Sequence, residues 1–153
     1  MIRIKNKLLR LLVKSSFPNS VRVWSLKKLG IHVGDAVYVG EGLTLACVLG
    51  SESLLYIGDR VSIAPNVTII LTSDPNNSRL VRLKDKYENI IAKGKVIIND
   101  DVWLGAGSII FPNVEIGEMS IIGAGSLVNR DVPGMTISAG VPSRIIRRLE
   151  LKI

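Results

Sequence analysis

"VWLGAGSIIFPNVEIGEMSIIGAGSLV", residues 102–128, carries an aliphatic side chain at every sixth position. Counted from four residues upstream, this series is Ile98, Leu104, Ile110, Ile116, Ile122 and Val128. Gly105, Gly117 and Gly123 follow their aliphatics directly. A period of six is neither the helical period of about 3.6 nor the alternation of a simple strand. It is typical of a chain that forms a short strand, turns, and repeats.

An earlier part of the chain has the same spacing. Its members are Val33, Val39, Leu45, Ile57, Ile63 and Ile69, with a miss at Ser51. Three sides of six residues make a coil of about eighteen residues, whose strands stack about 4.8 Å apart. The small residue after each aliphatic is expected to let the backbone turn sharply, in some cases at positive φ. The alternative, a β-sandwich, would show period-two alternation, which is missing here, so the sequence predicts an all-β fold, a parallel β-helix over residues 31–140.

The two series differ in register, because Ile69 and Ile98 are 29 residues apart, one short of five repeats. We therefore expect residues 73–95 to leave the coil as a polar excursion. Its basic residues are Arg79, Arg82, Lys84, Lys86, Lys93 and Lys95, against Asp74, Asp85 and Glu88. This surplus suits a phosphorylated or acidic glycan, although exposed charges on any loop would look the same.

The net charge of +7 belongs to the N-terminus. Residues 1–30 contain no acid, and their basic residues are Arg3, Lys5, Lys7, Arg10, Lys14, Arg22, Lys27 and Lys28. The remaining chain is close to neutral, so a nucleic-acid partner is not expected. Neither a signal peptide nor a membrane-spanning segment is predicted. The single cysteine, Cys47, has apolar neighbours, which favours a core side chain over a reactive thiol.

Residues 1–30 are predicted to form a basic, amphipathic helical arm, in which Ile4, Leu8 and Leu11 share one side. One interpretation is that Leu8, Leu11 and Trp24 cover the open end of the coil, as solenoids require. The other is that the arm caps the coil and that residues 1–16 also contact an anionic membrane. The predicted location is cytoplasmic, and the second interpretation adds the inner face of the membrane.

"VWLGAGSIIFPNVEIGEMSIIGAGSLVNRDVPGMTISAGVPSRIIRRL", residues 102–149, resembles the hexapeptide-repeat acyltransferases. The likeness is to the sugar O-acetyltransferases, a branch that includes maltose and galactoside acetyltransferases. It implies a left-handed β-helix, a homotrimer, and acetyl-coenzyme A bound in a groove between neighbouring β-helices. Residues 141–153 are expected to form a short C-terminal helical tail.

The resemblance also implies a set of cofactor-binding residues. They are Trp103 at the acyl end, Ala106 and Ala124 along the pantetheine arm, Asn129 and Arg130 beside the nucleotide, and Arg144 and Arg147 near the phosphates. The chemistry of these residues agrees, since small side chains expose backbone groups and arginines bind phosphate with paired donors. The alternatives are plain packing for Trp103 and a solvated face for the arginines.

In this family a histidine acts as the general base on the acceptor hydroxyl. The resemblance puts that histidine at Ser73. The only histidine, His32, lies more than two coils away by counting repeats. We therefore hypothesise that Asp74, oriented by Ser73, assists the acceptor hydroxyl, against the alternative that "SDPNNS" is only a turn. One histidine cannot build a three-histidine zinc site, so no metal is expected.

Together these features predict an acetyl-coenzyme A-dependent sugar O-acetyltransferase that modifies a surface-polysaccharide precursor. The alternative is a trimeric β-helix scaffold or binding protein that has lost catalysis.

Overall fold

Most strands belong to three sheets, which the chain visits in rotation. The computed structural model describes residues 2–87 and 90–150, with side chains from residue 4 onward. Face A comprises β1 (His32–Val33), β4 (Leu55–Ile57), β9 (Val96–Ile98) and β12 (Val114–Ile116). Face B comprises β2 (Tyr38–Val39), β5 (Ser62–Ile63), β10 (Trp103–Leu104), β13 (Ile121–Ile122), β15 (Thr136–Gly140) and β16 (Ser143–Arg148). Face C comprises β3 (Thr44–Ala46), β6 (Thr68–Ile70), β11 (Ile109–Ile110) and β14 (Leu127–Val128).

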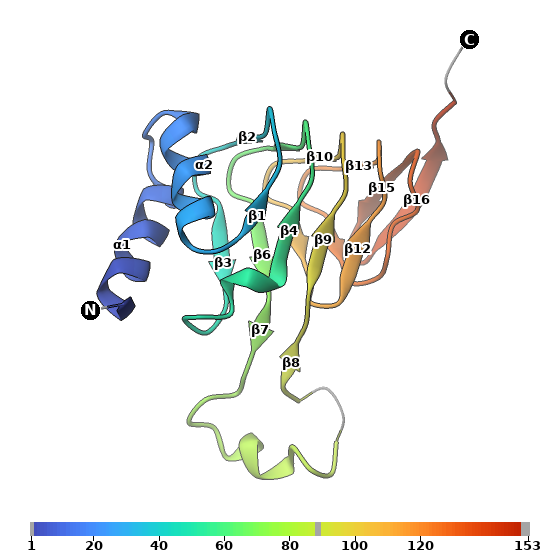
Figure 1. The fold of residues 1–153 in the computed structure, drawn as a ribbon. Helices are drawn as coiled ribbons and strands as arrows, with labels where there is room; N and C mark the ends of the chain where they lie inside the picture. Colours follow the sequence, from blue (N-terminus) through green and yellow to red (C-terminus); the bar gives the residue numbers. More distant parts are fainter. Residues whose placement is uncertain (1, 88–89, 151–153) are drawn as a thin grey trace.

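Each strand of a face pairs in parallel with the strand one coil away, and β16 alone on these faces is antiparallel. On face A, for example, Ile57 pairs with Val33 on one side and Ile98 on the other. Figure 1 shows the coils stacked between the helices at one end and β16 at the other. This rotation is the topology of a three-sided parallel β-helix, as the six-residue repeat predicts.

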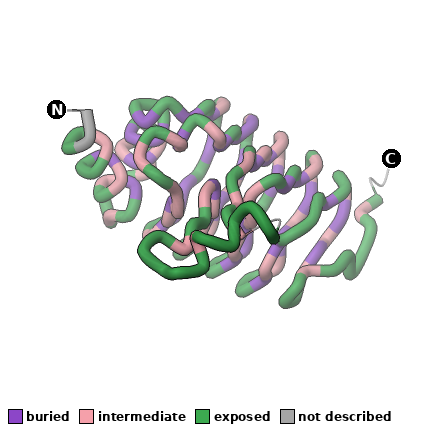
Figure 2. The backbone as a smooth tube through the Cα atoms, turned by 90° about the horizontal axis from the view of Figure 1, so that it is seen from below, coloured by how far each residue is buried: buried purple, intermediate pink, exposed green. Residues whose placement is uncertain are grey.

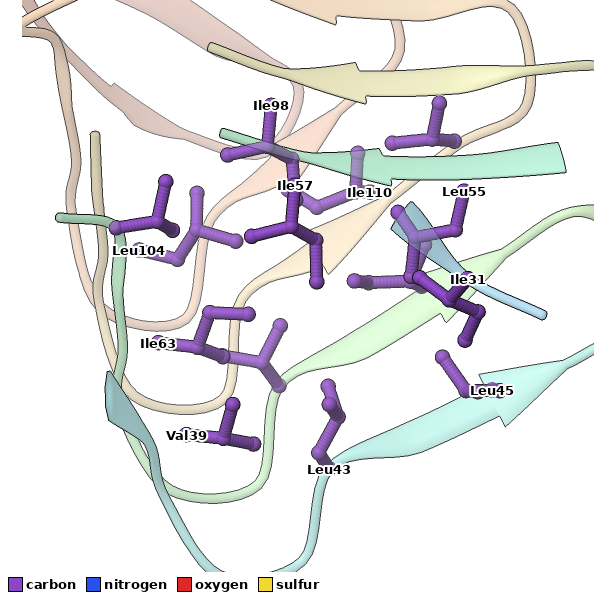
Figure 3. Close-up of a cluster of buried hydrophobic side chains, with 14 of the residues drawn as sticks. Ile31, Val39, Leu43, Leu45, Leu55, Ile57, Ile63, Ile98, Leu104 and Ile110 are labelled. Carbon is purple, nitrogen blue, oxygen red and sulfur yellow. The ribbon is translucent and has the colours of Figure 1, made fainter. Parts of the chain in front are cut away.

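The repeated aliphatics form the core. From Ile98 to Val128 every sixth residue is fully buried, as are Ile57, Ile63 and Ile69. Figure 3 shows part of this core, in which Ile57, Ile63, Ile98, Leu104 and Ile110 point toward one another. Burial of one aliphatic per side is therefore what the period of six encodes.

The miss at Ser51 has a structural cause. His32 pairs with Tyr56, so the first coil has 24 residues, one repeat more than eighteen. The additional repeat forms the corner between faces C and A and contains the 3₁₀ helix Glu52–Leu54. The excursion leaves the next coil at the same corner, and the Thr72 hydroxyl accepts a hydrogen bond from Val48 N (2.8 Å). The two interruptions are thus stacked on one corner.

The glycines after the aliphatics are required because the backbone of the next coil packs closely against them. The expected reason was a sharp turn of the backbone at these positions. A Cβ on Gly105 would lie 2.5 Å from Ala124 N and 2.6 Å from Ile122 O in the next coil. The positive φ falls two residues later, at Gly107. At the corner from face A to face B, the residues with positive φ are not glycines. They occupy equivalent positions in successive coils and are Ala36, Arg60, Asp101, Met119 and Met135.

The predicted C-terminal helix is wrong. Residues 143–148 form β16, which pairs antiparallel with β15, and Leu149 N donates to Met135 O (2.7 Å). The last coil would otherwise present an unpaired strand edge, and the chain covers that edge by turning back on itself. Residues 151–153 of the predicted tail lie outside the described residues.

Two helices, α1 (Ile2–Lys14) and α2 (Asn19–Lys28), cover the other end of the coil. The residues that pack there are Leu9, Val13 and Leu26, each buried. Leu8, Leu11 and Trp24, which one interpretation assigned to the cap, are instead 58%, 64% and 50% exposed. Leu9 and Val13 are one helical turn apart and form the buried face of α1. The predicted apolar side, with Ile4, Leu8 and Leu11, therefore does not pack on the coil.

An ion pair fixes α1 to the enlarged corner. The Arg10 guanidinium lies 2.8 Å from the carboxylate of Glu52, which is buried, and it also donates to the carbonyl oxygen (3.0 Å) and sulfur (2.8 Å) of Cys47. Burial raises the pKa of the Cys47 thiol, an effect that Arg10 partly offsets. Cys47 therefore acts as part of this packed contact.

Candidate functional site

Residues that precede the buried aliphatics point outward and form continuous rows across each face. On face B one row joins Trp103, Ile121, Ile137 and Arg147 in register. Trp103 is 53% exposed, and Arg147 is exposed at the far end. Three strand spacings separate these two residues, or about 14 Å. The row thus has an aromatic ring at one end, two isoleucines in the middle and a cation at the other end.

The corner between faces B and C runs beside this row. Ala106 and Ala124 are exposed there on successive coils, and Gly125 N donates to Ala106 O (2.8 Å). Gly107 and Gly125 have open space where a Cβ would be. Small side chains thus leave backbone atoms of the corner accessible to a long, thin ligand.

Two further predicted cofactor residues meet at the C-terminal end. Arg130 and Arg144 line a hollow of about 290 Å³ together with Asp131, Ser138 and Ser143. The Arg144 guanidinium donates to Ser143 O (2.8 Å). Asn129 is exposed beside Arg130, after β14, on the corner between faces C and A. The structure therefore divides the predicted set between the face B row with its corner and this end hollow.

Ser73 and Asp74 lie at the foot of the excursion. Strands β7 (Thr72–Ser73) and β8 (Ala92–Lys93) form its antiparallel stem, and both side chains of interest are exposed. No residue from 72 to 95 is buried among those described (Figure 2).

The predicted orientation of Asp74 by Ser73 is not observed. The Asp74 carboxylate accepts from Asn76 N (2.6 Å), and Asn76 Nδ2 donates to Asp74 O (2.9 Å). Ser73 is the last residue of β7 and makes no hydrogen bond to Asp74 in the described structure. Neighbouring side chains of an extended chain point in opposite directions, which separates the two groups. The turn is confirmed, and Asn76 is the residue that orients the carboxylate.

The predicted catalytic and cofactor residues lie on different corners of the chain. Asp74 projects from the corner between faces C and A, whereas Trp103 and Ala106 lie on face B and on its corner with face C. One chain therefore does not bring them together. A site that uses both must form between two chains.

Repeat counting missed a groove around the only histidine. His32 and Tyr56 stack with ring centroids 4.4 Å apart, and they line a hollow of about 440 Å³ on face A with Lys95 and Glu115. Lys95 is the last residue of the excursion, and β4 alone lies between β1 and β9 on face A, so His32 lies about two strand spacings, or about 10 Å, from the returning end of the excursion. His32 and Tyr56 each directly precede a buried aliphatic and pair across face A. Treating the residue before each aliphatic as outward-facing would have predicted that their side chains lie together on the surface.

Elsewhere the described residues offer no metal site, since they contain no group of three or more metal-binding side chains. Arg60 bridges two coils at the corner between faces A and B, with its guanidinium 2.7 Å and 2.8 Å from the Asp101 oxygens. That contact holds the pKa of Asp101 below its usual value. It is exposed and joins corners of the coil, so we treat it as structural.

Comparison with known proteins gives consistent matches. Residues 95–130 match the family described as bacterial transferase hexapeptide (six repeats). A galactoside O-acetyltransferase of Escherichia coli (strain K12) is 39% identical over 119 residues, which is 78% of this chain and 54% of that protein. The chain thus spans about half the length of such curated relatives.

Solved structures match over nearly the whole chain. A maltose O-acetyltransferase from Clostridium difficile 630 is 30% identical with a TM-score of 0.65, covering 97% of this chain and 87% of that one. A hexapeptide-repeat acetyltransferase from Vibrio cholerae O1 biovar eltor, complexed with acetyl coenzyme A, is 25% identical with a TM-score of 0.66 and the same coverage, 97% and 87%. These neighbours imply that the coil is left-handed.

Proposed function

Because this chain belongs to the hexapeptide-repeat acyltransferase family, we propose that it is an acetyl-coenzyme A-dependent O-acetyltransferase acting on a sugar hydroxyl. The observation that carries the proposal is the face B row from Trp103 to Arg147, beside a corner of exposed alanines. Relatives named as galactoside and maltose O-acetyltransferases support the sugar acceptor.

The row matches the chemistry of acetyl-coenzyme A from end to end. Trp103 would wall the acyl end, and the isoleucines would pack against the apolar part of the pantetheine arm. Ala106 and Ala124 leave backbone groups within reach of its amides. Arg147 would bind phosphate with paired donors, and Arg130 and Arg144 would add charge at the same end of the coil.

Asp74 is the group that we assign to the proton transfer. The acceptor oxygen attacks the thioester carbonyl carbon, and the carbon–sulfur bond breaks. Asp74 takes the hydroxyl proton and returns it to the departing sulfur, which leaves as the thiol of coenzyme A. The hydrogen bond from Asn76 N fixes one carboxylate oxygen and leaves the other available. A thioester is already activated, so positioning supplies much of the rate.

We infer that the active site forms between two chains of a homotrimer. The excursion of one chain would cover the face B row of its neighbour, which brings Asp74 to the acyl end. The different corners occupied by the two halves support this arrangement.

The excursion favours an acidic or phosphorylated acceptor, such as a surface-polysaccharide precursor. Its described basic side chains outnumber its acidic ones, and Tyr87 is 51% exposed beside Lys86. An exposed ring can stack on a sugar while neighbouring cations bind its acidic groups.

The direct test of the function is acceptor-dependent release of coenzyme A thiol. Purified protein is mixed with acetyl-coenzyme A and a panel of neutral, acidic and phosphorylated sugars, and the products are identified by mass spectrometry. We expect an O-acetylated sugar. No turnover, together with no acetyl-coenzyme A binding, would support the degenerate scaffold instead.

Trp103→Ala tests the cofactor row. A buried aromatic contact contributes about 2 kcal/mol or more to binding, so the Kd for acetyl-coenzyme A should rise about thirtyfold. Titration calorimetry measures it, and Tyr38→Ala, an exposed aromatic on the outer strand of the same face, is the matched control. Equal affinities for the wild type and the Trp103 variant would remove Trp103 from the site.

A further inference from the structure

Helix α1 carries two apolar stripes, of which the coil uses only one. Leu9 and Val13 pack on the coil and are 4% and 1% exposed. Ile4, Leu8 and Leu11, here called the α1 stripe, are 75%, 58% and 64% exposed. At about 100° per residue the α1 stripe spans about 60° and is centred about 150° from the buried side chains. Capping the coil therefore does not explain the α1 stripe.

Lysines border the α1 stripe on both sides. Lys7 and Lys14 follow one edge and Lys5 the other, at about 60–90° from its centre. All three are exposed, and they pair with no carboxylate in the described part of the chain. An apolar centre flanked by cations is the pattern of a helix that lies in the plane of a lipid interface.

The surface beside the α1 stripe continues this pattern. A hollow of about 350 Å³ is lined by Lys7, Arg10, Leu11, Lys14 and Leu49. Val48, on the same enlarged corner, is 62% exposed. The Arg10–Glu52 ion pair joins that corner to α1, so the patch is presented on a fixed support.

We propose that the α1 stripe docks this protein on an anionic phospholipid surface. The apolar side chains would enter the boundary between headgroups and acyl chains, and the flanking lysines would extend to the phosphates. A second copy of the chain fits this surface less well, because pairing two α1 stripes would bring two sets of lysines together. Anionic phospholipid headgroups would neutralise the lysines on both sides of the α1 stripe.

Docking here is peripheral. Among the described residues no helix is long and apolar enough to cross a membrane. In the proposed homotrimer, threefold symmetry presents three α1 stripes at one height along the axis, so that their weak contacts add. The coil would then stand away from the membrane with its C-terminal end outermost, because α1 covers the opposite end (Figure 1).

Vesicle flotation of the full chain tests the proposal. We expect binding to equimolar phosphatidylglycerol and phosphatidylcholine, no binding to phosphatidylcholine alone, and release at high salt. The double variant Leu8→Glu, Leu11→Glu should lose at least tenfold in partitioning. Both residues are exposed, so thermal unfolding and acetyl-coenzyme A binding should remain unchanged.

Two further variants complete the test. Ile146→Glu introduces the same carboxylate at an exposed position, 67% accessible, at the other end of the coil, and should bind vesicles as the wild type does. Lys7→Gln with Lys14→Gln keeps the α1 stripe and should weaken binding about fivefold for each lysine. The proposal fails if the wild type ignores anionic vesicles or if the Leu8, Leu11 variant binds them equally. It also fails if that variant changes the oligomeric state instead.

Discussion

Replacing Asp74 with asparagine should lower acceptor-dependent release of coenzyme A by about 10²–10⁴-fold, the range that a general base contributes. The amide keeps the shape of the turn and can still accept from Asn76 N, but it cannot take the hydroxyl proton. The Kd for acetyl-coenzyme A should not change. Initial rates with saturating substrates, measured beside a binding titration, separate the two effects.

Two other residues of the chain provide control variants for the Asp74 prediction. Asp85→Asn removes another exposed carboxylate from the same excursion and should leave the rate unchanged. His32→Gln tests the only other side chain with the chemistry of a general base near neutral pH, in the groove at the foot of the excursion. If the Asp74 variant turns over as fast as the wild type, and the His32 variant does not, His32 is the base.

Ile122→Ala should lower the free energy of unfolding by about 2–5 kcal/mol, the usual cost of a cavity at a fully buried site. Ile122 lies between Leu104 and Ser138 of the adjacent coils, and neither coil can close the gap without shifting its neighbours. For a chain of this length the midpoint of thermal unfolding should fall by about 10 °C.

Ile121→Ala is the matched control for this stability prediction. It removes the same atoms from the same strand, but from a half-buried side chain on the outer face. Denaturant titration of both variants should give a much smaller loss for Ile121. Equal losses would contradict the assignment of the inner row as the core.

The period of six predicted the coil because each repeat buries one aliphatic, and burial at Leu104 and its counterparts is a local property of the sequence. The excursion was visible for the same reason, as a break in that register. The enlarged first corner was not, because a miss at Ser51 looks the same whether a side chain is replaced or a repeat is added. Only the pairing of His32 with Tyr56 separates these cases.

The C-terminal strand could not be predicted from its own residues. "SRIIRR" is too short to distinguish a helix from a strand by periodicity. The free edge of β15 decides the matter, and that edge exists only after the coil has formed. The buried side of α1 could not be predicted from its own residues either, because both Leu8 and Leu9 fit a helical apolar pattern. Leu9 is the buried one because of where α2 and the enlarged corner lie.

The sequence named candidate site residues but not where the coil places them relative to one another. Trp103, Ala106 and Ala124 could be named from a resemblance, and the structure aligns them along one face and corner. Repeat counting does not say on which corner Asp74 lies relative to Trp103. The separation of these residues is a property of the coil, and it is the reason for proposing that a second chain completes the site.

Mixed trimers test the shared active site most directly. Asp74→Asn chains supply an intact face B row, and Trp103→Ala chains supply an intact excursion, so differently tagged chains can be co-expressed and mixed trimers isolated by sequential affinity steps. Each isolated mixed trimer has one complete interface out of three, whichever chain is in excess. Assayed with acetyl-coenzyme A at or below the wild-type Kd, activity should return to roughly a third of the wild type, well above either variant alone. Mixed trimers as inactive as the two parents would contradict a site formed between chains.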